Sequence, residues 1–468
     1  MKKVLAIVLA GVLAVSVCAC GDDETVTNAS TSTTTETSVS VDNQSTVEIP
    51  VVDDTAKGEG VMTYAEYVAA ELDTEVVVEC YVQDHQSWWD NAIKVYAADQ
   101  DGAYFIYDMA CSEEDAAKLV PGTKIKVTGY KSEWGGEVEI ADATFEFEEG
   151  STYVADVKDL TDLLGTDELI DYQNQYVVFK DLVVEEVSYK NGEPGDDIYI
   201  TASKDGKSYS FCLEYYLNGS DEEFYNSFAD LYPGTVCDFE GYLYWYYGMN
   251  PHITGVNGHG YINDKSEGTM NYIQYAMANL DDEVTVEFYV QATQSWWDNA
   301  IKVYGADIDG GYFAYDLACS EEDAAKLVPG TLIKVHGYKS AWSGEVEIVD
   351  GTFEIIDSDY AYIAPATDVT SYVGQDEISS YMNQLVSFTD MTVEAVSYKN
   401  DTPGDDIYVT LSKDGVNVEF CLEYYLNGSD EELYNTVGNL AVGLIVDVEG
   451  YLYYYEGPDA HLTAVTVK

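Results

Sequence analysis

Apolar and polar residues alternate in short runs along most of the chain after about residue 60, and this pattern predicts β-strands. The first such unit contains the runs EVVVECYVQ, AIKVYAAD and AYFIYDMA, and a short helix is predicted before them at 64–72. A second helix, SEEDAAKLV, begins at Ser112 with acids in its first turn and ends at Pro121 and Gly122. The hairpin KIKVTGYKSEWGGEVEI completes the unit. The predicted order is three strands, a helix and two strands.

The next unit has the same order with different residues. A helix is predicted at 157–164, followed by the strand YVVFKDLVVEEVS and the loop YKNGEPGDD. The strands IYITASK and SYSFCLEYYL come next, then the helix SDEEFYNSFADL, which ends before Pro233 and Gly234. The last hairpin is VCDFEGYLYWYYGMNPHIT. We name the first unit type A and the second type B.

Three long phrases occur twice, which shows that the A-B pair was duplicated. They are QSWWDNAIKVY at 86–96 and 294–304, CSEEDAAKLVPGT at 111–123 and 319–331, and CLEYYLNGSDEE at 212–223 and 421–432. The chain therefore reads A-B-A-B. The expected modules are 61–150 (module 1), 151–262 (module 2), 263–357 (module 3) and 358–468 (module 4).

Five strands with a helix between the third and fourth is the element order of the OB-fold. Together with the segments PGTKIKVTGY and PGTVCDFEGY, this order resembles the OB-fold domains of exported bacterial lipoproteins and nucleases. The resemblance implies a mostly β protein with four tandem five-stranded OB-fold barrels, each carrying a helix between strands three and four. It also implies a ligand face on strands two and three, flanked by the one–two and four–five loops, without naming the ligand.

The amino terminus resembles a lipoprotein export signal. Two lysines precede an apolar run at 4–17, and the small residue Ala19 precedes Cys20 as in a bacterial lipobox. The resemblance implies a signal peptide at 1–19 and a lipid on Cys20, with a Ser/Thr-rich disordered tether at 20–60. It places the protein at the surface of a Gram-positive bacterium, in the outer leaflet of the cytoplasmic membrane. An ordinary secretory peptide is the alternative.

The charge of the chain excludes some partner classes. There are 86 acidic and 21 basic residues, for a net charge of -65, and every basic residue is a lysine. This balance argues against nucleic-acid binding and against electrostatic attachment to anionic lipids. Solubility at an acidic cell surface explains the charge, and calcium binding is the alternative. The weak cation-site candidates are Asp196, Asp197, Asp405 and Asp406.

Tryptophans mark the candidate ligand loops. Six of the seven lie in the predicted one–two and four–five loops of the type A modules, and Trp245 lies in the four–five loop of module 2. Indole stacking on sugar rings, with polar neighbours bonding hydroxyls, would explain them, and Gln83 and Gln86 could join. The candidate contacts are Trp88, Trp89, Asp90, Asn91, Lys94, Trp134, Trp296, Trp297, Asp298, Asn299, Lys302 and Trp342. Adjacent tryptophans in an extended loop point opposite ways, so one of each pair is expected to face a ligand. Alternatively, these rings plug the barrel ends or pack between modules.

No catalytic motif is present, no histidine pair has metal-ligand spacing, and no cofactor is expected. The cysteines are predicted to be buried thiols, with Cys212–Cys237 as the disulfide to test first. The sequence thus predicts a monomeric, non-enzymatic surface lipoprotein that binds an extracellular ligand, with a glycan favoured over a surface protein. A structural scaffold is the alternative, and nucleic-acid binding is the least favoured.

Overall fold

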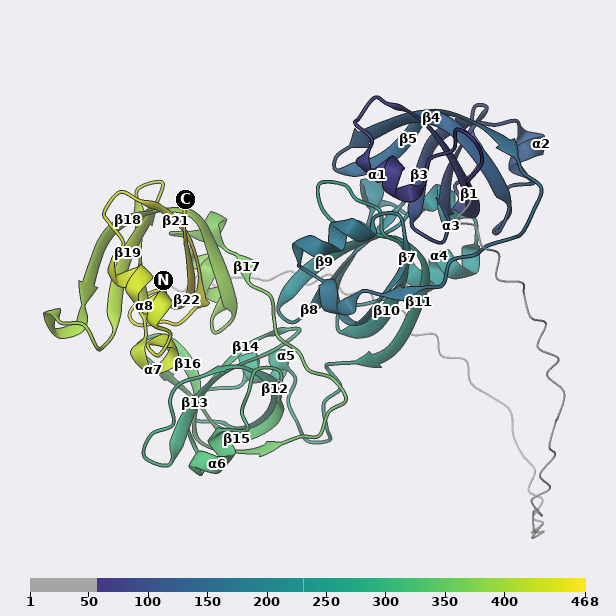
Figure 1. Cartoon of the computed structure of the whole chain (residues 1–468). Coiled ribbons are helices and arrows are strands. Elements are labelled where there is room, and N and C mark those ends of the chain that lie inside the picture. Colours follow the sequence, from purple (N-terminus) through teal and green to yellow (C-terminus); the bar gives the residue numbers. More distant parts are fainter. Residues whose placement is uncertain (1–56, 230) are drawn as a thin grey trace, which may run out of the picture. The chain divides into compact units, whose positions relative to one another are not determined.

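The computed structural model describes residues 57–229 and 231–468 (Figure 1). The predicted signal peptide, Cys20 and most of the tether lie outside these residues. In the described part, every helix is too short or too polar to cross a bilayer.

Each type A module is a closed five-stranded barrel. Module 1 contains α1 (Tyr64–Ala69), β1 (Glu75–His85), β2 (Ala92–Ala98), β3 (Ala103–Ala110), α2 (Glu113–Ala116), β4 (Lys124–Trp134) and β5 (Glu137–Phe147). The strand order is β1-β2-β3-β5-β4, and β4 pairs with β1 to close the barrel. Alternate residues of β1, such as Val76 and Val78, are fully buried, as the period of a half-buried strand requires.

Module 3 repeats this arrangement. It contains α5 (Tyr272–Met277), β12 (Glu283–Thr293), β13 (Ala300–Asp307), β14 (Gly310–Ala318), α6 (Glu321–Ala324), β15 (Leu332–Trp342) and β16 (Glu345–Ile355), closed in the order β12-β13-β14-β16-β15. The helices between strands three and four are single turns, shorter than predicted. Ser112 and Ser320 cap them as expected, each accepting a hydrogen bond from the backbone N–H three residues on.

The type B modules are near-barrels with one extra short strand. Module 2 contains β6 (Lys158–Asp159), β7 (Tyr176–Tyr189), β8 (Ile198–Lys204), β9 (Lys207–Leu213), α3 (Tyr215–Asn218), α4 (Glu222–Ala229), β10 (Thr235–Tyr242) and β11 (His252–Tyr261). Module 4 contains β17 (Thr367–Asp368), β18 (Leu385–Tyr398), β19 (Ile407–Lys413), β20 (Val416–Leu422), α7 (Tyr424–Asn427), α8 (Glu431–Gly438), β21 (Ile445–Tyr451) and β22 (Asp459–Val467). Strand β7 pairs with β10, and β18 pairs with β21. The predicted mostly β fold of four five-stranded units is confirmed.

Two predicted elements of the type B modules are wrong. The helix expected at 157–164 is instead β6, paired in parallel with β7, followed by a 3-10 turn at Thr161–Leu163. The Asp159 carboxylate accepts hydrogen bonds from the Thr161 backbone and hydroxyl, which favours a turn over a helix. The strand SYSFCLEYYL ends at Leu213, because Tyr215 begins α3 and donates its backbone N–H to Asp197.

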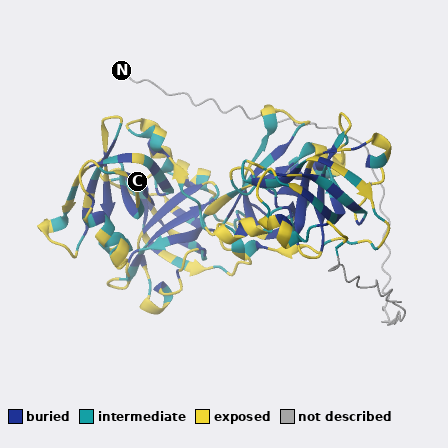
Figure 2. Ribbon diagram, turned by 45° about the horizontal axis from the view of Figure 1, so that its top comes forward, coloured by how far each residue is buried: buried dark blue, intermediate teal, exposed yellow. Residues whose placement is uncertain are grey.

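The six cysteines in the described part are free thiols, and the Cys212–Cys237 disulfide does not form. Side chains alternate along β9, so Phe211 and Leu213 enter the module 2 core together with Cys237 while Cys212 points to the opposite face. Figure 2 shows that buried residues follow the strands and exposed residues follow the loops and helices.

Candidate functional site

The strand-two and strand-three face of module 3, the expected ligand face, packs against module 4. Tyr304 on β13 is fully buried, and its ring stacks on Tyr451 with centroids 4.4 Å apart and an interplanar angle of 11°. Its hydroxyl lies 2.8 Å from His461 Nδ1, and Phe313 on β14 lies beside it with ring centroids 4.7 Å apart. The face of strands two and three of module 3 therefore meets β21 and β22 of module 4, and the aromatic rings between them are buried.

The same contact joins module 1 to module 2. Tyr96 stacks on Tyr242 with centroids 4.3 Å apart and an angle of 9°, and its hydroxyl lies 2.8 Å from His252 Nδ1. Because the two pairs reproduce each other's geometry, we treat the A-B pair as the structural unit of the chain.

Loops on either side tie each pair together. In the second pair, the Ser295 N–H donates to the Tyr425 carbonyl at 2.7 Å, and the Glu456 N–H donates to the Ser343 carbonyl at 2.7 Å. The first pair has the equivalent bonds from Ser87 to Tyr216 and from Tyr247 to Gly135, both at 2.6 Å. The duplicated Trp-Trp loop is thus held against α3 or α7 of the type B module.

An aromatic cleft of about 520 Å³ remains open beside the buried contact of modules 3 and 4. It is lined by Gln294, Lys302, Phe313, Tyr315, Trp342, Asp406, Tyr408, Cys421, Glu423, Tyr425, Tyr453, Tyr455, Asp459 and His461. Trp342 is 56% exposed, and its ring centroid lies 5.4 Å from that of Tyr455. Lys302 Nζ lies 4.8 Å from the Tyr315 ring centroid and 3.0 Å from Asp316. Exposed ring faces therefore lie next to hydrogen-bonding groups.

Every residue lining this cleft, except Asp459, has an identical counterpart in modules 1 and 2. The counterparts are Gln86, Lys94, Phe105, Tyr107, Trp134, Asp197, Tyr199, Cys212, Glu214, Tyr216, Tyr244, Tyr246 and His252, with Asn250 in place of Asp459. Some positions away from the cleft differ, including one in the core, where Cys80 corresponds to Phe288, although other segments such as CSEEDAAKLVPGT are also identical. On β9, Tyr209 and Ser210 have become Val418 and Glu419. The two copies differ at scattered positions outside the cleft and at a single position of its lining.

Burial shifts the titration of the cleft groups. Desolvation and the nearby Asp406 raise the pKa of Glu423 to about 7. Desolvation, Glu419 and Asp406 raise the pKa of Asp459 to about 6. Desolvation lowers the pKa of His461 to about 4, so this histidine is neutral at neutral pH. The cleft is therefore an acidic and partly dry site.

A buried glutamate lies at the edge of each A-B contact. Glu345, at the start of β16, is fully buried and accepts a hydrogen bond from the Tyr454 backbone N–H at 2.9 Å. Burial raises its pKa to about 8, and the Asn383 side chain lies beside it. Neither Glu345 Oε1 nor Asn383 Oδ1 has a hydrogen-bond partner.

The structure separates the predicted contacts into two groups. Lys302 and Trp342 line the cleft, as does Gln294, while Trp296, Trp297, Asp298 and Asn299 do not. By sequence correspondence, Lys94, Trp134 and Gln86 are the module 1 counterparts of the first group, and Trp88, Trp89, Asp90 and Asn91 are those of the second. Gln83 serves a backbone role, because its amide oxygen accepts a hydrogen bond from the Ala155 N–H at 2.8 Å.

The adjacent tryptophans point in opposite directions, as predicted. Trp88 packs on the module 1 core, and its indole N–H donates to the Cys111 carbonyl at 2.8 Å. Trp296 makes the same bond to Cys319 at 3.1 Å. Trp89 is 78% exposed and faces solvent. Asp90 and Asn91 have positive φ, as do Asp298 and Asn299, and each pair forms a turn that reverses the direction of the chain.

The weak cation candidates are neutralised by lysines. Lys190 Nζ lies 2.8 Å from Asp197 and 3.3 Å from Asp196, and Lys399 holds Asp405 and Asp406 in the same way. Each lysine stands where a cation would bind, which argues against a metal at these aspartates.

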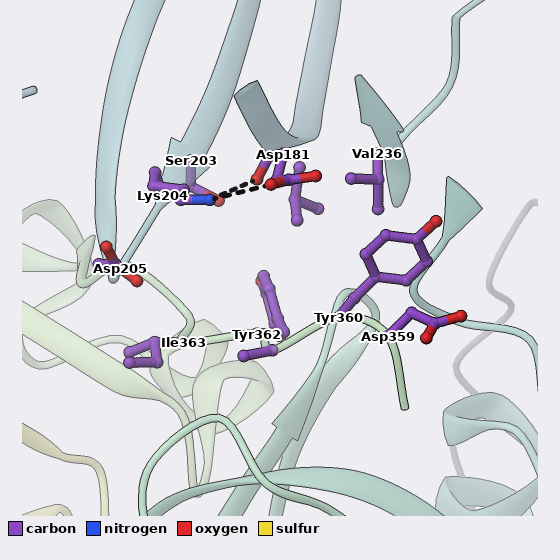
Figure 3. A pocket seen from close by; sticks show the side chains of 11 residues that line it. Asp181, Ser203, Lys204, Asp205, Val236, Asp359, Tyr360, Tyr362 and Ile363 are labelled. Atoms are coloured by element: carbon purple, nitrogen blue, oxygen red, sulfur yellow. Dashed lines mark hydrogen bonds and ion pairs between the residues drawn. The ribbon is translucent and has the colours of Figure 1, made fainter. Parts of the chain in front are cut away.

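A second hollow, of about 130 Å³, is shown in Figure 3. Asp181, Lys204 and Val236 of module 2 and Tyr360 of the segment before β17 contribute to its lining. Lys204 Nζ lies 3.3 Å from the Asp181 carbonyl. This hollow is smaller and contains no tryptophan, so the cleft is the better site candidate.

Several residues of the cleft were not predicted from the sequence, notably Tyr315, Tyr408 and Glu423. Glu423 and Tyr425 belong to the repeated phrase CLEYYLNGSDEE, which had served only to detect the duplication. The near-identity of this phrase in the two copies was the available signal, since neighbouring segments have diverged.

Neither a family model nor a curated protein matches this sequence. Among solved structures, the chain is similar to the HIN2 domain of tetrameric p202, with 13% identity over 39% of this chain and 92% of that chain and a TM-score of 0.17. A murine DNA-binding protein bound with double-stranded DNA gives 11% identity over 39% and 100% and a TM-score of 0.17. A replication protein A heterotrimer bound to single-stranded DNA gives 7% identity over 63% and 93% and a TM-score of 0.17. Similarities with such low identities and TM-scores carry no argument about ligands. The closed five-stranded barrels of the chain are themselves consistent with OB-like folds.

Proposed function

We propose that this chain is a non-enzymatic surface lipoprotein that binds an extracellular glycan in the cleft of each A-B pair. The observation that supports the proposal is the retention of the cleft lining, at all but one position, between two copies that differ at several core positions. A packed core tolerates substitutions that keep its volume, whereas a recognition surface does not. The lipid anchor at Cys20 rests on the sequence alone.

The chemistry of the cleft fits a sugar. Trp342 and Tyr455 present partly exposed rings on which the C–H face of a pyranose can lie, and Gln294 and Lys302 offer hydrogen bonds to hydroxyls. Two clefts on one chain also allow two residues of a polymeric glycan to bind together. Such bivalence raises the apparent affinity without any additional contact.

Replacing the cleft tryptophans is expected to abolish detectable glycan binding. The Trp134→Ala/Trp342→Ala variant removes an aromatic wall from each cleft, and the loss of a buried aromatic anchor at an interface is about 2 kcal/mol or more, roughly thirtyfold in affinity. A glycan array first finds the ligand, and titration calorimetry then compares the variants.

The matched control is Trp89→Ala/Trp297→Ala, which removes two tryptophans that are more exposed and do not line the cleft. It should bind as the unmodified protein does. Equal losses in both variants, or a blank array for the unmodified protein, would contradict the proposal.

A protein-interaction scaffold is the second candidate. The burial of Tyr96 and Tyr304 between modules shows that OB-type faces in this chain pack against protein. Trp89 and Trp297, each 78% exposed, could extend such packing to a partner. If the control variant, and not the cleft variant, loses attachment to a surface, the scaffold is the better description.

Single-stranded DNA is expected not to bind, even at low salt. The net charge of -65 repels phosphates, and the lysines near the cleft are paired with aspartates. Fluorescence anisotropy of a labelled oligothymidine in low-salt buffer checks this. Saturable binding that weakens steeply with added salt would reverse the conclusion.

A further inference from the structure

Asp459 is the one cleft residue that differs between the two pairs, and its counterpart is Asn250. The two residues occupy the same backbone position. The Asp459 N–H donates to the Tyr453 carbonyl at 2.9 Å, and the Asn250 N–H donates to the Tyr244 carbonyl at 2.9 Å. The exchange therefore changes the charge of the cleft without changing the fold around it.

The Asp459 carboxylate lacks a cationic partner. Among the described residues, no lysine or histidine forms an ion pair with it, because Lys302 is held by Asp316 at 3.0 Å and Lys399 by Asp406 at 2.8 Å. Asp459 is half-buried and pairs across the sheet with Glu419, a second acid. In the first pair, the counterpart of Glu419 is Ser210. The second cleft thus has one acid, Asp459, that the first does not have, and a second acid, Glu419, lies beside it on the neighbouring strand.

We propose that Asp459 makes the second cleft selective for glycans that carry a protonated amine, while the first cleft, with Asn250, prefers the neutral or acylated form. This inference rests on the proposed glycan function. An unpaired carboxylate in a partly dry cleft attracts an ammonium group more strongly than it would in open solvent. The surrounding rings of Tyr453, Tyr455 and Trp342 add a cation–π attraction. The Asn250 amide can instead donate to or accept from an acetamide or a hydroxyl group without a charge.

The test compares short β-1,4-linked glucosamine oligomers with their N-acetylated forms near neutral pH, using titration calorimetry. Binding to each cleft is measured separately in the full chain. Trp134→Ala leaves the second cleft for study, and Trp342→Ala leaves the first. Asp459→Asn is then introduced into the Trp134→Ala protein, and Asn250→Asp into the Trp342→Ala protein. The sister cleft shows that the fold accepts either residue at this position.

The second cleft is expected to prefer the amine form, and Asp459→Asn should reduce that preference about tenfold, which corresponds to about 1.4 kcal/mol. Asn250→Asp should shift the first cleft towards the amine form. Binding of both oligomers with an unchanged preference in the two variants overturns this inference and leaves the glycan function intact. If neither oligomer binds the unmodified protein but the array yields another glycan, Asp459 does not select an amine and the inference is overturned. A blank array overturns the glycan function, and the inference falls with it.

Discussion

Folding stability is expected to be greatest near pH 4.5 and to fall on either side, because buried acids and two buried histidines have opposite effects. Burial raises the pKa of Glu137 and of Glu345 from 4.5 to about 8. The folded state then binds more protons than the unfolded state throughout this window, so stability decreases as the pH rises through it. Full stabilisation from these groups is present only below about pH 4.5.

The histidines act in the opposite direction. Burial lowers the pKa of His252 from 6.5 to about 3 and that of His461 to about 4. At these two histidines the folded protein binds fewer protons than the unfolded chain. Their contribution to stability is therefore fully present above pH 6.5 and decreases as the pH falls towards the folded pKa values. Between 4.5 and 6.5 the slopes of these four groups cancel. The total still falls slowly as the pH rises, because burial raises the pKa of Glu139, Glu214 and Glu423 to about 7. Above 6.5 only the acids contribute, and each is expected to lose on the order of 2 kcal/mol between pH 6.5 and 8.

Urea denaturation followed by tryptophan fluorescence at a series of pH values measures this profile. Glu137→Gln/Glu345→Gln should reduce the slope on the alkaline side, since a glutamine keeps the shape of the side chain and removes the group that titrates. The control Glu146→Gln/Glu354→Gln changes exposed acids on the same strands and should keep the alkaline slope. An unchanged slope in the first variant would show that the buried acids do not control the profile.

The local pattern of the sequence was sufficient to predict the barrels. The strand order and the position of the helix follow from alternation, Ser112-type caps and Pro-Gly stops, all of which act within a few residues. The helices α3 and α7 were missed because the EYYL segment is apolar enough for a strand. Their start depends on Asp197 and Asp406, which accept hydrogen bonds from backbone N–H groups 18 residues away.

The site was harder to predict, because it is formed by two modules. Tyr96 and Tyr304 alternate with core residues of their own strands, and nothing local shows that they face another barrel. The two tryptophans of the repeated loop have identical local signals, yet Trp88 enters the core and Trp89 faces solvent. Lys302 and Trp342 line the cleft, and the expected OB face had indicated both of them because it places them near the open end of the barrel.

Replacing Tyr304 with alanine is expected to destabilise modules 3 and 4 by about 3–5 kcal/mol, the cost of removing a large buried aromatic side chain. The ring is fully buried and contacts Tyr451 and Phe313, so its removal leaves a cavity in the A-B contact. Tyr304→Phe keeps the rings and removes only the hydroxyl that lies 2.8 Å from His461 Nδ1. That change should cost about 1–2 kcal/mol, because a buried nitrogen loses its partner.

Urea denaturation gives both values, and near-UV circular dichroism reports whether the aromatic stack survives. Tyr315→Ala is the matched control: its ring is 38% exposed and lines the cleft, so it should weaken glycan binding with little loss of stability. Tyr304→Ala should mainly lower the stability of the protein. It should weaken glycan binding only indirectly, because the A-B contact that forms one wall of the cleft opens. If Tyr304→Ala unfolds within about 1 kcal/mol of the unmodified protein, the two modules do not fold as a unit. The cleft would then have no fixed second wall, and a glycan would meet only the single face of one barrel.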